Sequence, residues 1–338
     1  MSEDATLFYG CLRSAITSDT TSELMCCKFN LAGDLIATGN ANGAVTVFQP
    51  HSSGAVYELR PSSGALRHLP VTGVHFRKVG SPTDAVQNNI LLASYSSGHV
   101  RHWHITTGQC LSTIKEDRET LAAAYSSDYR SFVTVGSDSK VHLYDESSLK
   151  LVSTFERSLS SSTMDGHASR VFAVRYHPSD PTSFLSAGWD DTIQFWDTRQ
   201  SHSVRRISGP HICGDSLDID SDTYDILTGS WSYSDTLQVW DFASGKLLST
   251  FQPTPQCKLY AACWLRPGVA LAGGTQAHLT VVADTRANKE LGGMRDMGHS
   301  VYGLDYHQRS NTVAVAAGSK LYSVALSSTL QALLNQEH

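Results

Sequence analysis

The stretch Gly166–Arg199, GHASRVFAVRYHPSDPTSFLSAGWDDTIQFWDTR, decides the fold. It holds three runs rich in apolar residues, at Val171–Tyr176, Phe184–Gly188 and Ile193–Asp197, separated by short segments of Pro, Ser, Gly and Asp. Apolar alternation with a period of two predicts β-strands, and turn residues between such runs predict antiparallel connections. The stretch is therefore expected to fold as three consecutive antiparallel strands.

This three-strand plan recurs along the chain. The third strand is the easiest to recognise, because it ends in a large side chain that is often followed by an acid. Its copies are VTVFQ at Val45–Gln49, VRHWH at Val100–His104, VHLYD at Val141–Asp145, IQFWD at Ile193–Asp197 and LQVWD at Leu237–Asp241, with weaker copies at Leu279–Ala283 and Leu321–Ala325. The copies are 41 to 55 residues apart. Short strands that repeat about every 40–45 residues are typical of propeller blades.

The repeats predict an all-β protein, a single seven-bladed β-propeller over residues 1–338 with four-stranded antiparallel blades. A fourth, outer strand can be recognised after most units, as in LVSTF at Leu151–Phe155 and LLSTF at Leu247–Phe251. The predicted blades are 18–60, 71–116, 119–156, 166–208, 211–252, 257–293 and 298–327.

The two ends of the chain have separate predicted roles. The seventh unit lacks an outer strand after Leu326, whereas Leu7–Thr17 precedes the first unit and has no unit of its own. We therefore expect residues 7–17 to supply the outer strand of the last blade, which closes the ring and removes its free sheet edges. Residues 328–338 are expected to form a short tail, with a short helix as one alternative.

Composition excludes several classes of protein. The chain has 338 residues, with 32 acidic against 26 basic side chains and a formal net charge of −6, and its basic residues are dispersed. Nucleic acid is therefore not expected as a partner. No apolar run approaches the roughly 18 residues that a membrane helix needs. The seven cysteines include no C-x-x-C pair, so we expect a cytoplasmic or nuclear protein without disulfides or zinc.

The stretch Gly166–Arg199 resembles a near-complete WD repeat, with its Gly-His pair, V-x-x-V-x-aromatic strand, S-x-x-x-D turn and Trp-Asp end. Weaker copies extend the resemblance over most of the chain. The WD-repeat β-propeller family is thus suggested, and the resemblance implies a ring of blades that serves as a platform for partner proteins.

Four residues match the positions that form a buried hydrogen-bond chain in WD repeats: His167, Ser186, Asp190 and Trp196. The same residue types also compose a Ser/His/Asp set, so a catalytic role is the alternative. A catalytic triad needs an exposed nucleophile beside an oxyanion pocket, and the sequence has no G-x-S-x-G turn. The structural role is therefore preferred.

No other motif points to chemistry. The sequence lacks a phosphate-binding G-x-x-x-x-G-K-[ST] loop, a G-x-G-x-x-G turn, H-E-x-x-H and a calcium loop. His102 and His104 lie on one face of a predicted strand and could hold a metal, but no third ligand has a defined position. We expect His102 to be a packed, hydrogen-bonded histidine, and we expect no metal, cofactor or small-molecule substrate.

The predicted mouth of the central channel supplies the candidate binding surface. By resemblance, it is bordered by loops that enter each inner strand and by the turns between second and third strands. The candidate residues are Glu23, Glu119, Arg170, Phe172, Trp189, Trp231, Lys258, Tyr260 and Tyr302. Aromatic residues and arginine dominate binding energy at protein interfaces. We expect Arg170 to face an acid of a partner's peptide or loop, and Phe172, Tyr260 and Tyr302 to enclose an apolar side chain; ordinary turn packing is the alternative.

Leu185–Arg199 also resembles the extended WDxR box of substrate receptors in cullin-RING ubiquitin ligases. That resemblance implies that Asp197 and Arg199 contact an adaptor propeller on the face opposite the mouth. The alternative is that Asp-x-Arg after Trp is common in WD repeats at large.

Taken together, the sequence predicts a non-catalytic scaffold or adaptor that binds other proteins at the channel mouth. A ubiquitin-ligase receptor is the alternative, and a propeller hydrolase with an unidentified site is a lesser one. Loop residues set specificity, so the fold does not name the partner.

Overall fold

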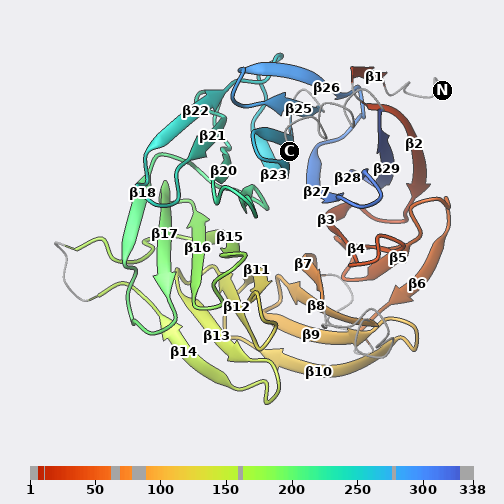
Figure 1. Ribbon diagram of the computed structural model, residues 1–338. Helices are drawn as coiled ribbons and strands as arrows, with labels where there is room; N and C mark the ends of the chain where they lie inside the picture. The colour runs from red at the N-terminus through yellow and green to blue at the C-terminus, as the bar shows by residue number, and fades with distance from the viewer. Residues whose placement is uncertain are drawn as a thin grey trace.

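The computed structural model describes residues 7–10, 12–61, 69–77, 89–158, 163–275 and 279–327. Its strands form seven antiparallel sheets arranged in a ring (Figure 1). The predicted fold class, a seven-bladed β-propeller, is confirmed. No helix of the described residues is long and apolar enough to cross a membrane. The predicted tail at 328–338 lies outside the described residues.

Each blade runs from an inner strand at the channel to an outer strand at the rim. Blade 1 is β3 (Leu24–Phe29), β4 (Ile36–Asn40), β5 (Val45–Phe48) and β6 (Ala55–Leu59), and blade 2 is β7 (Val71–Phe76), β8 (Ile90–Tyr95), β9 (His99–His104) and β10 (Gln109–Lys115). Blade 3 is β11 (Thr120–Tyr125), β12 (Ser131–Gly136), β13 (Val141–Asp145) and β14 (Leu151–Phe155), and blade 4 is β15 (Val171–Tyr176), β16 (Ser183–Gly188), β17 (Thr192–Asp197) and β18 (Arg205–Ser208). Blade 5 is β19 (Leu217–Ile219), β20 (Ile226–Gly229), β21 (Leu237–Trp240) and β22 (Leu247–Phe251).

Blades 6 and 7 include strands from the start of the chain. Blade 6 is β23 (Leu259–Arg266), β24 (Val269–Gly274), β25 (Thr280–Asp284) and β26 (Lys289–Arg295), with β1 (Leu7–Gly10) beside β26. Blade 7 is β27 (Val301–His307), β28 (Thr312–Ala317) and β29 (Lys320–Leu326), with β2 (Leu12–Asp19) as its outer strand.

The core lies between the faces of neighbouring blades. The middle strands, such as β4 and β5, are buried at every residue, whereas the outer strand β14 is exposed over its first half. Phe155 of blade 3 packs on Trp196 of blade 4, with ring centroids 5.9 Å apart. Because both faces of a middle strand are covered, its sequence reads as a continuous apolar run rather than an alternation.

Ring closure is confirmed, with one correction to the predicted segment. β2 pairs with β29 from Leu12↔Leu326 to Asp19↔Lys320, so the start of the chain completes blade 7. The prediction that all of residues 7–17 join the last blade was wrong, because β1 pairs with β26 of blade 6. β1 thereby covers an edge strand that would otherwise present unpaired backbone groups. Residues 18 and 19 were assigned to blade 1 but belong to the closing strand.

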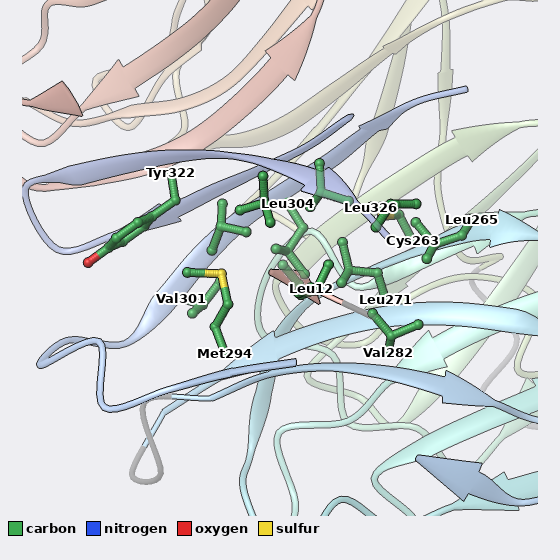
Figure 2. Packing of buried hydrophobic residues seen from close by; sticks show 14 of the residues in the cluster. Leu12, Cys263, Leu265, Leu271, Val282, Met294, Val301, Leu304, Tyr322 and Leu326 are labelled. Carbon is green, nitrogen blue, oxygen red and sulfur yellow. The ribbon is translucent and has the colours of Figure 1, made fainter. Parts of the chain in front are cut away.

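Leu12 anchors the closing strand in the core. Its side chain is fully buried and lies in one cluster with residues of blades 6 and 7, among them Leu271, Val282, Leu304 and Leu326 (Figure 2). The closing strand β2 is thus packed against both blade 6 and blade 7.

We expect Leu12→Ala to lower the free energy of unfolding by about 2–5 kcal/mol, because it leaves a cavity between blades 6 and 7. Ile16→Ala is the control, since Ile16 lies on the same strand but is 36% exposed, and should change it by about 0.5 kcal/mol. Urea unfolding followed by tryptophan fluorescence measures both. Equal effects would show that the strand is not anchored through Leu12.

Candidate functional site

The side chains at the channel are oriented by a β-bulge at the start of every inner strand except β19. In β15, Val171 pairs with Gly188 and Ala173 with Ala187, so Phe172 is the extra residue. In a regular strand, positions three apart face opposite sides, and a bulge re-aims the side chain. Phe172 and Arg175 are accordingly both half-buried, while the other residues of β15 are buried. The same pattern in β3, β7 and β27 gives the channel two levels, an upper mouth and a middle.

The predicted aromatic residues of the mouth form one continuous row, which we call the aromatic arc: Phe172, Trp189, His211, Trp231, Tyr260 and Tyr302. Successive ring centroids are 5.1 Å (Phe172–Trp189), 6.3 Å (Trp189–His211), 6.3 Å (His211–Trp231), 6.3 Å (Trp231–Tyr260) and 4.9 Å (Tyr260–Tyr302) apart. These separations lie within the roughly 4.5–7 Å over which rings attract each other. The arc therefore crosses blades 4 to 7 as a packed surface.

His211 is the member of the arc that the sequence analysis missed. It lies in the connection between blades 4 and 5, and its Nδ1 is 2.6 Å from Oδ1 of Asp191. The sequence pattern around His211 was hard to recognise. The segment that leads into blade 5 is irregular, and the inner strand of this blade has only three residues. An aromatic ring just before an inner strand is the feature that would have marked it.

The two cations of the mouth are held differently. Nη1 of Arg170 donates to Oε2 of Glu119 at 2.7 Å, and both side chains are nearly half exposed. Arg170 thus already pairs with an acid of its own chain, and its contact with an acid of a partner stays a prediction. Nζ of Lys258 lies 3.9 Å from the ring centroid of Trp231 and 4.7 Å from that of Tyr233.

Glu23 does not join these residues. It is exposed at the entry to blade 1, and its backbone carbonyl accepts a hydrogen bond from the N–H of Ala41. In the part of the chain that the structure describes, its side chain makes no ion pair with the mouth.

Below the arc lies a cavity of about 220 Å³. Its walls include Phe172, Tyr260 and Tyr302 from the arc, with Val74 and Leu121 from the opposite side of the channel. A second cavity of about 410 Å³ opens to the other face and is lined by Tyr125, Tyr129 and His177, among others.

An ion cluster at the middle level separates the two cavities. Asp215 accepts from Nη2 of Arg175 at 2.5 Å and lies 3.0 Å from Nζ of Lys28, which is also 3.4 Å from Asp305. Burial alone would raise the pKa of Asp215, but Arg175 and Lys28 lower it below its ordinary value. Burial raises the pKa of Asp218, against the opposing effect of Arg175. The cluster closes the channel, so the mouth is a pocket with a charged floor.

The four predicted network residues of blade 4 are hydrogen-bonded to each other. Nδ1 of His167 is 2.8 Å from Oδ2 of Asp190, Nε2 of His167 is 2.6 Å from Oγ of Ser186, and the indole N–H of Trp196 donates to the same Oγ at 2.7 Å. The order along the chain is therefore Asp190, His167, Ser186 and Trp196, and the histidine bridges the acid and the serine. Ser186 and the side chain of His167 are fully buried, so no substrate can reach this Ser/His/Asp set.

Blade 3 builds the same network from different residues. Arg118 takes the place of the histidine, donating to Asp138 and to Oγ1 of Thr134, at 2.7 Å each. A second acid, Glu116, accepts from Nε of Arg118 at 3.0 Å and from the hydroxyl of Tyr144 at 2.8 Å. Burial alone would raise the pKa of Glu116, but hydrogen bonds and the charge of Arg118 hold it well below its ordinary value.

The histidines of blade 2 are held by neighbouring side chains. His102 is buried, with Nδ1 2.8 Å from Oγ of Ser112 and Nε2 3.2 Å from Glu146. His104 lies 2.9 Å from Oγ1 of Thr107. Among the described residues, no three side chains are grouped to hold a metal ion.

Asp197 and Arg199 lie at the end of β17, on the face opposite the arc. The guanidinium of Arg199 makes a two-pronged contact with the carboxylate of Asp197, at 2.8 and 2.6 Å. The Arg199 side chain is 73% exposed.

The comparisons with known proteins agree with this architecture. The family model "WD domain, G-beta repeat" matches residues 158–197. Similar proteins include WD repeat-containing protein 89 homolog of Dictyostelium discoideum, 28% identical over 48% of this chain and 43% of that protein. RACK1, a small ribosomal subunit protein of Drosophila melanogaster, is 34% identical over 25% of this chain and 28% of its own length. Autophagy-related protein 16 of Arabidopsis thaliana is 22% identical over 88% of this chain and 54% of its own length.

Seven antiparallel blades in a closed ring, six with four strands and one with five, define the class of β-propellers. A WD repeat is matched in blade 4 and the relatives include WD-repeat proteins, so the chain is a β-propeller that contains a WD repeat and is similar to WD-repeat proteins. WD-repeat proteins generally act as scaffolds for protein interactions. The matches cover 43%, 28% and 54% of the lengths of these three relatives.

Glu116→Gln should lower the free energy of unfolding at pH 7 by about 3–5 kcal/mol, because it leaves the buried Arg118 with one acid fewer. The folded pKa of Glu116 lies below its ordinary 4.5, so its stabilising effect is complete above that pH and is lost as the pH falls below it. The free energy of unfolding should therefore fall less in the variant than in the wild type when the pH is lowered from neutral into the acid range.

The control is Glu156→Gln in the same blade. Glu156 pairs with Lys140 in solvent, so its loss should cost about 1 kcal/mol or less. Chemical unfolding at a series of pH values measures both variants. An unchanged acid dependence in Glu116→Gln would contradict the assignment.

Proposed function

We propose that the protein is a non-catalytic scaffold that binds a peptide or loop of a partner protein at the aromatic arc. The observation that carries the proposal is the arc itself, six rings in contact at one end of the channel, three of which line a preformed cavity. Four of its members, Trp189, Trp231, Tyr260 and Tyr302, are of the residue types that most often dominate interface energetics.

The arc is also suited to binding because it is already ordered. Its rings pack on each other, so a partner would not have to immobilise them, and ordering side chains is a main cost of association. Trp189 is nevertheless 43% exposed, which leaves apolar area for a partner to cover.

The proposal includes a cytoplasmic or nuclear location and no catalysis. The six cysteines in the described part of the chain are all free, which favours a reducing compartment. The one Ser/His/Asp set is buried and serves blade 4.

Trp189→Ala and Tyr260→Ala should each reduce capture of the partners bound by the wild type, because each removes a ring from the arc. Affinity capture from cell extract with quantitative mass spectrometry measures the loss, which we expect to be about tenfold or more. Leu248→Ala is the matched control, a 54% exposed apolar side chain on the outer strand of blade 5. Partner sets that are unchanged in both arc variants would refute the proposal.

A receptor for a cullin-RING ubiquitin ligase is the second candidate, and the observation that favours it is the exposed Arg199 on the face opposite the arc. The two functions are compatible, since one face would take the substrate and the other the adaptor.

Arg199→Ala should abolish co-purification of an adaptor propeller while leaving capture at the arc intact. Arg206→Ala, an exposed arginine on the outer strand of the same blade, is the control. Adaptor that is retained by Arg199→Ala, or absent from the wild-type capture, would rule out this second role.

A further inference from the structure

We propose that the mouth recognises a short acidic segment, in which a carboxylate binds Lys258 and an apolar side chain one or two residues away enters the cavity beneath the arc. This inference rests on the proposed function and specifies the chemistry of the partner.

Lys258 is the cation of the mouth that has no acid of its own. Arg170 is paired with Glu119, and His211 lies against Asp191. Within the described ranges, Lys258 makes no ion pair, and its ammonium lies over the rings of Trp231 and Tyr233.

The rings hold the ammonium in place without neutralising it. A cation is attracted to an aromatic face, and a partly buried charge still favours an opposite charge beside it. Lys258 is only half-buried, so part of its side chain is open to solvent and can be reached by a carboxylate. The side chain is thus both oriented and available.

The cavity below the arc has the size of one side chain. Its volume is about 220 Å³, below the roughly 300–1,000 Å³ of pockets that enclose drug-sized ligands. The rings of Phe172, Tyr260 and Tyr302 and the side chains of Val74 and Leu121 give it apolar walls. An aliphatic or aromatic side chain of a partner therefore fits better than a polar one.

The distance between Lys258 and the cavity determines how far apart the acid and the apolar residue are in the bound peptide. Lys258 immediately precedes β23 and Tyr260 is the extra residue of the bulge at its start, so the two subsites are neighbours along the chain. An extended peptide advances about 3.3–3.6 Å per residue. The acid and the apolar residue should therefore be one or two positions apart.

The floor of the cavity fixes which side chain goes where. Three carboxylates, Asp215, Asp218 and Asp305, surround two cations, Lys28 and Arg175. Lys28, Arg175 and Asp215 are the members of this cluster that line the cavity, and both cations are already paired with carboxylates. The acid of the peptide therefore binds at Lys258, and the apolar side chain enters the cavity.

The test is selection from a random peptide display library on four purified full-length proteins: wild type, Lys258→Glu, Tyr302→Ala and Lys246→Glu. Lys246 is an exposed lysine at the start of the outer strand of blade 5, so its reversal is the matched control. Thermal unfolding first establishes that each variant is folded. Trp189→Ala replaces Tyr302→Ala if the latter does not fold.

Wild type and Lys246→Glu should enrich peptides with Asp or Glu one or two positions from Leu, Ile, Met or Phe. Lys258→Glu should keep the apolar preference, lose the acidic one and enrich Lys or Arg in its place. The best wild-type peptide, measured by fluorescence anisotropy, should bind Lys258→Glu at least tenfold more weakly, and exchange of its acid for lysine should reverse the order.

Acid enrichment that persists in Lys258→Glu overturns this inference but leaves the proposed function standing if binding is still lost in Tyr302→Ala. Peptides that bind Tyr302→Ala as well as the wild type locate binding elsewhere and overturn both. A selection without enrichment overturns this inference alone, because a folded loop captured from extract would still support the proposed function.

Discussion

The structure depends on covering both faces of every blade, and the pairing of β2 with β29 makes this possible. A blade at the end of an open row would expose one apolar face, whereas a closed ring has no end blade. Leu12 links the closing strand to blade 6, and Thr20 donates to the carbonyl of Ser319 at 2.9 Å as the chain enters blade 1. Blade 1 in turn packs on blade 7 through Leu24, Ala314 and others. The closing strand β2 and the strands of blades 1, 6 and 7 are thus packed into one continuous ring.

The seven inner strands meet at the channel, and their free edges carry backbone N–H groups that no neighbouring strand pairs. These groups need other hydrogen-bond partners, which is a second constraint on the structure. Two acids of the middle level satisfy such groups across blade boundaries. Asp305 of blade 7 accepts from the N–H of Phe29 in blade 1 at 2.7 Å, and Asp218 of blade 5 accepts from the N–H of Trp264 in blade 6 at 2.9 Å. Buried backbone donors need such partners. The ion cluster is therefore part of how the blades are joined, and closing the channel is its consequence.

The repeat could be predicted because blade 4 keeps the whole pattern and the others keep its period. The hydrogen-bond network of blade 3 could not be predicted from the sequence. Arg118 and Glu116 stand there in place of the expected histidine, and these residue types do not match the pattern. The division between β1 and β2 depends on which edge is free after folding, a tertiary property. The mouth positions could be counted from the aromatic residue that ends each inner strand. The pairing of Arg170 with Glu119 could not, because the two residues belong to different blades.

The β-bulges explain how one residue of an inner strand can contribute to the binding surface while its neighbours are buried between the blades. Phe172 is flanked by the fully buried Val171 and Ala173, and Tyr302 follows the fully buried Val301. A bulge residue is not part of the regular ladder, so its side chain is free of the size limits that the stacked blades impose on the residues beside it. Blades 1 to 3 have Met25, Thr72 and Leu121 at this position, whereas blades 4, 6 and 7 have Phe172, Tyr260 and Tyr302. Aromatic rings are thereby confined to one side of the mouth, which gives a nearly symmetric ring a binding surface with a direction.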